Sequence, residues 1–375
     1  MKRTTTLPLI AISLAFGCLM PSLHSHAADA LTEKAAAVEP SAPAIISRFV
    51  AIDNVCAWPN LTVLRDGTII ATIFNKPSHG KAEGDVECWE TIDGQFWSKR
   101  GTAGPHEDSA NRMNVAAGLA NSGDLLVLAA GWSLKKDDKG KVASLMEVLA
   151  PWICRSSDGG ATWKIDKESF PRAAEGRTQY VPFGDILPAG DGTLRAACYA
   201  RDLKTKKDAV WMFRSADGGR TWEVQSRISE AHNETAIFHL GSGKWLAAAR
   251  TIDNQRLDLI RSEDDGKTWI AAGPLSTAAQ IPAHFASLKD GRLLLTYGNR
   301  IKGQFGVLAK LSNDEGKTWS EPLALVNDLL SGDCGYPSSV QLPDGKMLTA
   351  YYTNSAPNHR RYHMGTVIWE APPTK

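Results

Sequence analysis

The stretch SSDGGATW at 156–163 returns along the chain as SADGGRTW at 215–222, SEDDGKTW at 262–269 and SNDEGKTW at 312–319. All of these copies fit S-x-D-x-G-x-T-W, and a shortened copy, TIDGQFW, stands at 91–97. In a tight turn, Ser and Asp side chains accept bonds from backbone N–H groups, and Gly supplies a positive φ. Thr and Trp then enter a strand, and the Trp ring fills space between neighbouring sheets. We therefore expect one hairpin turn per copy, and not a calcium loop, because Trp stands where later ligands would be needed.

A second series of turns alternates with the first. Six times, a Gly-containing turn precedes a short apolar run: TIIATIF (68–74), LLVLAA (125–130), TLRAACY (193–199), KWLAAAR (244–250), RLLLTYG (292–298) and KMLTAYY (346–352). The glycines of these turns are on average about 56 residues apart. Each period has room for four strands, and helical signals are few. The pattern predicts an all-β fold, a six-bladed β-propeller with four-stranded antiparallel blades.

The composition is that of a folded soluble protein. The chain has 375 residues, 43% of them hydrophobic and 22% charged, which is wrong for a disordered protein. Its 42 Lys and Arg residues balance 41 Asp and Glu residues. Because nucleic-acid binders usually carry a clear basic excess, we expect no nucleic-acid partner. Nothing in the pattern signals an oligomer, and we expect a monomer.

The N-terminal region predicts export. Lys2 and Arg3 precede an apolar stretch at 7–19 that is too short to span a bilayer. Small residues before Ala28 predict a signal peptide over 1–27, cleaved after Ala27. A membrane anchor, or a lipoprotein modified at Cys18, is the alternative. A flexible lead-in is expected over 28–44 and the propeller over 45–375, in a bacterial periplasm or outside the cell, with no membrane span after cleavage.

Five cysteines remain after removal of the leader, at positions 56, 88, 154, 198 and 334. An odd number in an exported protein leaves at least one thiol unpaired. Their spacing contains no C-x-x-C, which argues against zinc. We expect buried, inert thiols, with a pairing of Cys56 and Cys88 left open. No cofactor motif occurs either, since the chain has no G-x-G-x-x-G before a helix, no G-x-x-x-x-G-K-[ST] and no H-E-x-x-H. We therefore expect no cofactor and no metal.

In a propeller, the innermost strands begin at one mouth of a central channel. Aligning the six periods on their turns places one residue from each at that mouth: Trp58, Asn114, Phe183, Glu234, Pro282 and Tyr336. Close beside them in the sequence stand Arg112, Tyr180, His232, Asn233, His284 and Asp333. Aromatic and polar groups around a concave mouth suit a glycan, which we expect as the partner.

The repeated turns resemble the Asp-boxes of sialidases, and the resemblance extends from about Val50 to Trp369. It implies a propeller and a retaining exo-glycosidase in which a neutral tyrosine attacks the anomeric carbon beside the sugar's own carboxylate. The segment HNETAIFHLGSGKWLAAAR at 232–250 resembles the stretch that carries the glutamate and a carboxylate-binding arginine, here Glu234 and Arg250. The segment DCGYPSSVQLPDGKMLTAYY at 333–352 resembles the last blade and implies Tyr336 as the nucleophile.

The resemblance implies two further roles. Arg300, in TYGNR at 296–300, corresponds to another arginine that binds the substrate carboxylate. The segment HGKAEGDVECWETIDG at 79–94 places Asp85 where the acid/base aspartate falls, and Glu83 competes with it. Trp58, Asn114, His232 and Tyr180 are expected to contact the substrate.

One position departs from the sialidase pattern. Ala57, two residues before Pro59, stands where these enzymes carry their first carboxylate-binding arginine. Arg112 or Arg177 could supply a replacement cation. The departure favours a related acidic sugar, such as a uronic or another ulosonic acid, alongside sialic acid.

Two other functions stay open. The first is a polysaccharide lyase or another glycan-active propeller, in which His232, His284, His106 and Tyr180 would serve as base and acid beside a uronate carboxylate. The second is a propeller that binds glycans without turnover, which the loss of the first arginine favours.

Overall fold

The structure is a computed structural model, which describes residues 43–374. The predicted signal peptide, the cleavage site at Ala27 and nearly all of the predicted lead-in lie outside the described residues. Within them the chain forms strands and no helix, so the all-β prediction is confirmed. None of the described elements is therefore a helix that could cross a membrane.

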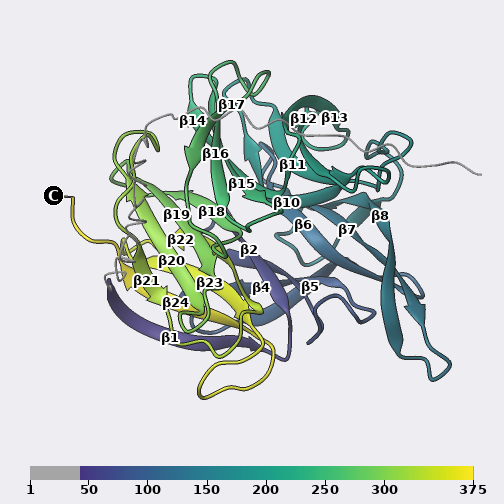
Figure 1. Cartoon of the computed structure of the whole chain (residues 1–375), viewed down its shortest axis with the longest axis horizontal. Helices are drawn as coiled ribbons and strands as arrows, with labels where there is room; N and C mark the ends of the chain where they lie inside the picture. Colours follow the sequence, from purple (N-terminus) through teal and green to yellow (C-terminus); the bar gives the residue numbers. More distant parts are fainter. Residues whose placement is uncertain (1–42, 375) are drawn as a thin grey trace, which may run out of the picture. The chain divides into compact units, whose positions relative to one another are not determined.

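Four of the sheets have four strands each (Figure 1). The first contains β2 (Ala57–Val63), β3 (Ile69–Phe74), β4 (Val86–Thr91) and β5 (Ser98–Gly104). The second contains β14 (His232–Gly241), β15 (Lys244–Thr251), β16 (Leu257–Ser262) and β17 (Ile270–Pro274). The third contains β18 (Ala283–Ser287), β19 (Leu293–Asn299), β20 (Gly306–Ser312) and β21 (Leu323–Val326). The fourth contains β22 (Cys334–Gln341), β23 (Met347–Thr353), β24 (His363–Glu370) and β1 (Ala44–Asp53).

The fifth sheet has eight strands in the order β13-β12-β11-β10-β6-β7-β8-β9. One half contains β6 (Ala110–Leu119), β7 (Leu125–Lys136), β8 (Val142–Ser156) and β9 (Lys164–Asp166). The other contains β10 (Val181–Pro188), β11 (Leu194–Arg201), β12 (Asp208–Ser215) and β13 (Glu223–Ser229). A short parallel pairing of β10 with β6, Gly184 opposite Ala116 and Asp185 opposite Ala117, joins the halves. Every other strand pair in the sheet is antiparallel.

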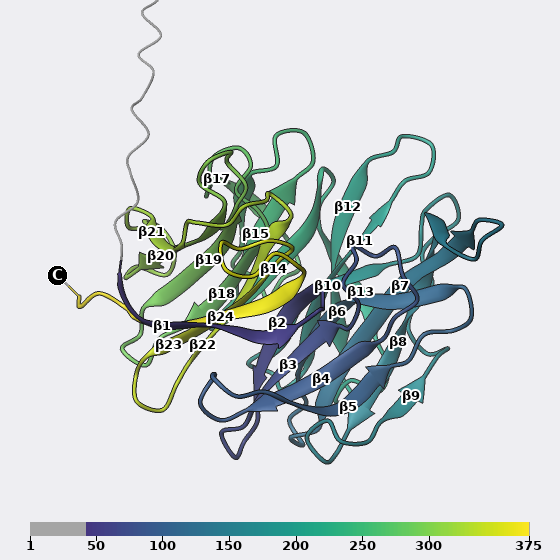
Figure 2. The same cartoon turned by 90° about the horizontal axis from the view of Figure 1, so that it is seen from below.

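The first strands of these sets of four contact one another in turn. β2 contacts β6, β6 contacts β10, and the series continues through β14, β18 and β22 back to β2. Figure 1 shows β2, β6, β10 and β18 near the middle of the described region. The fourth sheet combines the two ends of that region, because β1 pairs with β24 over Ala44–Asp53 (Figure 2).

The second strand of each set carries the apolar run that follows a Gly turn. Every residue of β3, β19 and β23 is buried. A strand that is covered on both faces has a continuous run of apolar residues, not an alternation of apolar and polar ones. By contrast, all five residues of β17, the fourth strand of its set, are exposed. Burial thus falls toward the outer edge in that set, whereas all four residues of β21, the fourth strand of the third set, are buried.

Apolar clusters fill the spaces between neighbouring sets, and the tryptophans of the repeated turns lie in them. Trp97, Trp163, Trp222, Trp269 and Trp319 each pack in or against a different cluster. The sixth cluster contains Trp369 of β24 instead. The predicted role of the Trp ring as a filler between sheets is confirmed.

The repeated turns use side chains as predicted. In the turn at 312–319, the hydroxyl of Ser312 accepts from the N–H of Gly316 (2.8 Å) and donates to Asp314 (2.8 Å). The carboxylate of Asp314 accepts from the hydroxyl (2.6 Å) and the N–H (2.9 Å) of Thr318. The same bonds recur at 156–163, 215–222 and 262–269. In the shortened copy, Thr91 replaces Ser and accepts from Gly94 N–H (2.9 Å).

Candidate functional site

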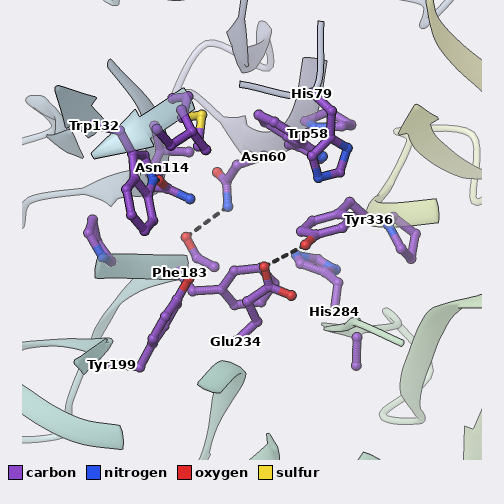
Figure 3. A pocket seen from close by; sticks show the side chains of 18 residues that line it. Trp58, Asn60, His79, Asn114, Trp132, Phe183, Tyr199, Glu234, His284 and Tyr336 are labelled. Atoms are coloured by element: carbon purple, nitrogen blue, oxygen red, sulfur yellow. Dashed lines mark hydrogen bonds between the residues drawn. The ribbon is translucent and has the colours of Figure 1, made fainter. Parts of the chain in front are cut away.

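A pocket of about 230 Å³ opens where the first strands of all six sets begin (Figure 3). It is small for a ligand site, so it fits one small ligand or one terminal sugar better than a long chain. Its lining comes from β2, β6, β10, β11, β14, β18 and β22, from the loop after β3 and from the hairpin of β7 and β8. The side chains most relevant to its chemistry are Trp58, His79, Asn114, Trp132, Phe183, Glu234, His284 and Tyr336.

The backbone is distorted at the pocket end of these strands. Ala57, Trp58 and Tyr336 have φ values of 52°, 47° and 49°. A non-glycine residue in this left-handed region is strained, and such strain clusters at functional sites. The pairing register between first and second strands also shifts here, for example between Ala57 and Asn60 and between Gly335 and Ser338. Bulges of this kind re-aim the side chains next to them.

Tyr336 and Glu234 form a short hydrogen bond across the pocket. The phenol of Tyr336 donates to Glu234 Oε1 at 2.5 Å, and Arg250 donates to Glu234 Oε2. Arg250 Nη1 also lies 3.4 Å from the phenolic oxygen. Burial, and then the negative charge of Glu234, raise the pKa of Tyr336 above its ordinary value. The phenol is therefore neutral, with a carboxylate placed to take its proton.

Two arginines border this pair. The Arg300 guanidinium lies 5.5 Å from the centre of the Tyr336 ring, and its Nε donates to the carbonyl of Cys334 (3.1 Å). Arg250 Nε and Arg300 Nη2 are buried and have no hydrogen-bond partner among residues 43–374. A buried donor without a partner costs about 1–3 kcal/mol, which a bound acceptor would recover. Neither arginine is itself among the residues that line the pocket, and both lie behind Tyr336, which does line it.

His79 lines the pocket from the loop between β3 and β4, and sequence reasoning missed it. Its Nδ1 lies 2.9 Å from Asp333 Oδ1, and its ring meets Trp58 edge-on at 5.0 Å between centres. Asp333 is further held by the hydroxyls of Tyr352 (2.6 Å) and Tyr362. The signal was present, because His79 opens the same segment from which Asp85 was chosen.

Asp85 and Glu83 do not line the pocket. The Asp85 carboxylate accepts from the N–H of His106 (2.8 Å), and its Oδ1 lies 2.6 Å from His106 Nδ1. Although burial opposes ionisation, the bonds from His106 hold the pKa of Asp85 below its usual range. Glu83 accepts from Lys136 Nζ (2.9 Å) and Ser109 N–H (2.7 Å). Both carboxylates are thus engaged outside the pocket.

Neither of the predicted replacement cations reaches the pocket. Arg112 is 2% exposed, donates to the carbonyl of Ala150 (2.8 Å) and to Glu107, and stacks on Trp152. Arg177 stacks on Trp211 instead, 5.1 Å from the ring centre. Neither arginine therefore replaces the cation that is missing at Ala57.

Tyr180 and His232 also lie elsewhere. The Tyr180 ring packs edge-on against Trp211 and Phe213 in the cluster between the halves of the eight-stranded sheet. His232 bonds to Ser229 and, through Nε2, to Asp258 (3.2 Å), and it lines a separate hollow. Neither residue is among those that line the pocket.

The predicted rim residues Trp58, Asn114 and Phe183 do line the pocket. Asn114 accepts from the indole N–H of Trp132 (3.3 Å), a residue that the sequence did not single out. His284 contacts the pocket too, with Nε2 3.2 Å from Asp185 and Nδ1 accepting from Ser339 N–H. The lining is thus mostly apolar with a few oriented polar groups, as ligand pockets usually are.

All five cysteines of the described region are free and buried, as predicted, so Cys56 and Cys88 do not pair. Burial raises the pKa of Cys88 to about 12 and that of Cys334 to about 11. These thiols are inert because the reactive species is the thiolate. No group of three or more metal-ligating side chains that could hold an ion occurs within 43–374.

Residues 67–348 match the BNR repeat-like domain. A sialidase of Bacteroides fragilis is 25% identical over 215 residues, which is 54% of this chain and 39% of that protein. The match thus spans about two fifths of that relative's length.

Solved structures share the fold. A Dyadobacter fermentans protein of unknown function has a TM-score of 0.73 at 22% identity, over 88% of this chain and 99% of that one. A Trypanosoma rangeli sialidase, solved with 2,3-difluorosialic acid as a covalent intermediate, has a TM-score of 0.64 at 16% identity, over 86% and 59%. A NanB sialidase of Streptococcus pneumoniae has 0.65 at 15% identity, over 89% and 71%. At these identities the likeness concerns the fold, which is that of a β-propeller.

Proposed function

We propose that this chain, which belongs to the BNR repeat-like domain family within the sialidase superfamily, is an exo-glycoside hydrolase for terminal acidic sugars. It would release sialic acid or a related ulosonic or uronic acid. One observation carries the proposal: the Tyr336 phenol, bonded to Glu234 and bordered by Arg250, faces a sugar-sized pocket.

We also propose that the propeller has six blades of four strands. The contacts that close from β22 back to β2 support this count, as do the six apolar clusters, one between each neighbouring pair of sets. The eight-stranded sheet would then be two blades that touch through the short β6–β10 pairing.

The chemistry follows from charge. An acidic sugar carries a carboxylate next to its anomeric carbon, and this charge repels an anionic nucleophile. A neutral phenol avoids the repulsion, and it becomes nucleophilic as Glu234 takes its proton. The raised pKa of Tyr336, caused by burial and then by Glu234, agrees with this role because it keeps the resting phenol protonated.

The two free guanidinium donors support an acidic substrate. Arg250 Nε and Arg300 Nη2 are buried without partners in the described region. A guanidinium binds a carboxylate through short, charge-assisted bonds. With Ala57 in place of a third arginine, the carboxylate would have two cationic partners, which widens the substrate class beyond sialic acid.

The lyase alternative has less support. Of His232, His284, His106 and Tyr180, only His284 lines the pocket, and both of its ring nitrogens already have partners. A glycan-binding propeller without turnover remains the meaningful alternative, because it requires the pocket and not the Tyr336–Glu234 bond.

The remaining parts of the proposal concern the whole protein. We propose that it acts as an exported monomer, in the periplasm or outside the cell, on glycans or glycoconjugates and not on nucleic acid. The predicted leader and the balanced charge support this reading.

The test is hydrolysis of aryl α-glycosides of sialic acid and of uronic acids by the purified protein, beside Tyr336→Phe and Arg250→Ala. Release of the aryl group that both substitutions abolish, with each variant folded, is the expected result. Saturable binding of the free sugar acid without release would favour the glycan-binding function, and an unsaturated uronate product would favour the lyase.

A further inference from the structure

We propose that His79, oriented by Asp333, is the general acid and base of this site. The inference rests on the hydrolase function proposed above and assigns the one role that function leaves open. His79 takes the role that the sequence resemblance implied for Asp85.

The position of His79 suits the role. It lines the same pocket as Tyr336, and both rings contact Trp58, with centres 5.0 Å and 6.1 Å from the indole. Figure 3 shows His79 beside Trp58, on the side of the pocket where Tyr336 lies. The His79 side chain is 55% exposed. A group that protonates a leaving oxygen must lie at the mouth, because the rest of the glycan leaves through it.

Asp333 fixes the orientation of the imidazole. Its Oδ1 is 2.9 Å from His79 Nδ1, and the carboxylate also accepts from Tyr352, Tyr362 and Asn354 Nδ2 (3.3 Å). Although burial opposes ionisation, these hydrogen bonds hold the pKa of Asp333 below its usual range. An ionised carboxylate can only accept, so Nδ1 carries a proton and Nε2 is left for the substrate.

No other acid of the described region competes from inside the pocket. The only carboxylate side chain that lines it is that of Glu234, which is bonded to Tyr336 and Arg250. Asp85, by contrast, is bonded to His106 and Asn75 outside the lining. The acid and base must therefore come from an imidazole, and His284 has both nitrogens engaged.

The two steps balance. In the first, Tyr336 oxygen bonds to the anomeric carbon, the glycosidic C–O bond breaks, Glu234 takes the phenolic proton, and imidazolium His79 gives its Nε2 proton to the leaving oxygen. In the second, neutral His79 takes a proton from water, the water oxygen bonds to the anomeric carbon, and the bond to Tyr336 breaks. Glu234 returns the proton to Tyr336. Each step transfers one sugar and two protons, and the site ends as it began.

The experiment compares leaving groups. Wild type, His79→Gln and His106→Gln are assayed on the 4-nitrophenyl and the methyl α-glycoside of whichever acidic sugar the wild type hydrolyses. General acid catalysis contributes about 10²–10⁴-fold, and a methoxide leaving group needs it far more than 4-nitrophenolate does. We expect His79→Gln to lower kcat/KM for the methyl glycoside by at least about 10²-fold and for the nitrophenyl glycoside by much less. His106→Gln should change both by a similar, small factor.

The pH profile gives a second readout. In the wild type, kcat/KM should fall at high pH, and this fall should be absent in His79→Gln. The other charged groups at the site are the same in both proteins, namely Glu234, Arg250, Arg300 and Asp333. Asp333→Asn should shift the same high-pH limb of the profile. Its ratio of kcat/KM for the methyl glycoside to that for the nitrophenyl glycoside should lie between the ratios of the wild type and of His79→Gln.

The outcomes separate the two proposals. Turnover that depends on Tyr336, with equal effects of His79→Gln on both glycosides, would overturn the role of His79 alone. A leaving-group dependence in His106→Gln or Asp85→Asn would assign the role to Asp85 instead. Absence of turnover of any acidic glycoside by folded wild type would overturn the hydrolase function, and this inference with it. His79 is exposed, so His79→Gln should fold as the wild type does, which the thermal midpoint checks.

Discussion

The phenol of Tyr336 donates to Glu234 at 2.5 Å although 102 residues separate the two in the chain. One residue comes from β22 and the other from β14, and the strands lie in different sheets. Arg250, on the neighbouring strand β15, completes the contact by pairing with the other oxygen of Glu234. The proposed nucleophile, its proposed base and a cation thus come from two sheets.

The Glu234–Arg250 pair should be coupled in stability. Glu234→Gln leaves the mostly buried Arg250 without its counter-charge, and breaking such a pair costs about 3–5 kcal/mol. The double variant Glu234→Gln with Arg250→Met should be less destabilised than the sum of the single variants. Urea unfolding measures all three. The exposed pair Arg172–Glu168 is the control, and its removal should change little. Additive effects at the buried pair would contradict the prediction.

Arg300 should act on substrate affinity. Its free Nη2 is buried beside Tyr336, and a charge-assisted bond to a substrate carboxylate is worth about 1.5–3 kcal/mol. Arg300→Ala should therefore raise KM for an acidic aryl glycoside by about 10-fold or more, as steady-state kinetics would measure. Arg177→Ala, at an arginine that stacks on Trp211 and not beside Tyr336, should leave KM unchanged. The same KM shift in both variants would count against a specific role for Arg300.

The repeated turns should make stability depend on pH. Bonds from the hydroxyl and the N–H of Thr318 lower the pKa of Asp314 to about 2. Because the folded pKa is depressed, the stabilisation is fully present above the unfolded value of about 4 and is lost as the pH falls toward 2. Asp314→Asn should therefore be less stable than the wild type at pH 7, with the difference shrinking between pH 4 and pH 2.

Urea midpoints at pH 7, 4 and 2.5 measure this difference. Asp253→Asn, at an exposed loop aspartate, is the control and should track the wild type at each pH. A difference for Asp314→Asn that is the same at all three values would show that the ionised carboxylate is not what stabilises the turn.

Gly118 should be required where the halves of the eight-stranded sheet meet. A Cβ at this position of β6 would lie 2.1 Å from the carbonyl oxygen of Ile186 in β10. Because the Ile186 carbonyl is backbone, and the new Cβ is fixed to the backbone of the neighbouring strand, the clash cannot be relieved without moving a strand. Gly118→Ala should therefore lower the free energy of unfolding by about 1–3 kcal/mol. At Gly190, the nearest atom to an added Cβ is 3.9 Å away. Gly190→Ala should therefore have the same thermal midpoint as the wild type. A similar loss of stability in Gly118→Ala and Gly190→Ala would refute the steric argument.

The predicted leader should be removed if the protein is exported as proposed. If the protein is expressed with its own N-terminus in a bacterium, the mass of the purified product should correspond to a chain that begins at Ala28. Ala27→Phe should slow cleavage and accumulate the precursor. A product that begins at a lipid-modified Cys18 would instead establish the lipoprotein alternative.

Some candidate residues that are close in the sequence face different ways in the structure, because the strands that carry them contain bulges. Arg112 and Asn114 are two residues apart, as are His232 and Glu234, so an ideal strand would point each pair to one face. The register shifts between Arg112 and Asn114, and between His232 and Thr235. The extra residue reverses the alternation, so Asn114 and Glu234 face the pocket while Arg112 and His232 do not.

The repeated turns and the apolar second strands are determined by the sequence itself. Their bonds close within eight residues, as between Ser312 and Gly316, and the buried runs of β3 and β23 are continuous in the sequence. The pairings of the site are of another kind. Tyr336 meets Glu234 across 102 residues, and His79 meets Asp333 across 254. Aligning the periods placed Glu234 and Tyr336 at one mouth, but only the tertiary structure decides which atoms meet. These contacts join strands and loops that are far apart in the sequence, and local conformational preferences do not encode such contacts.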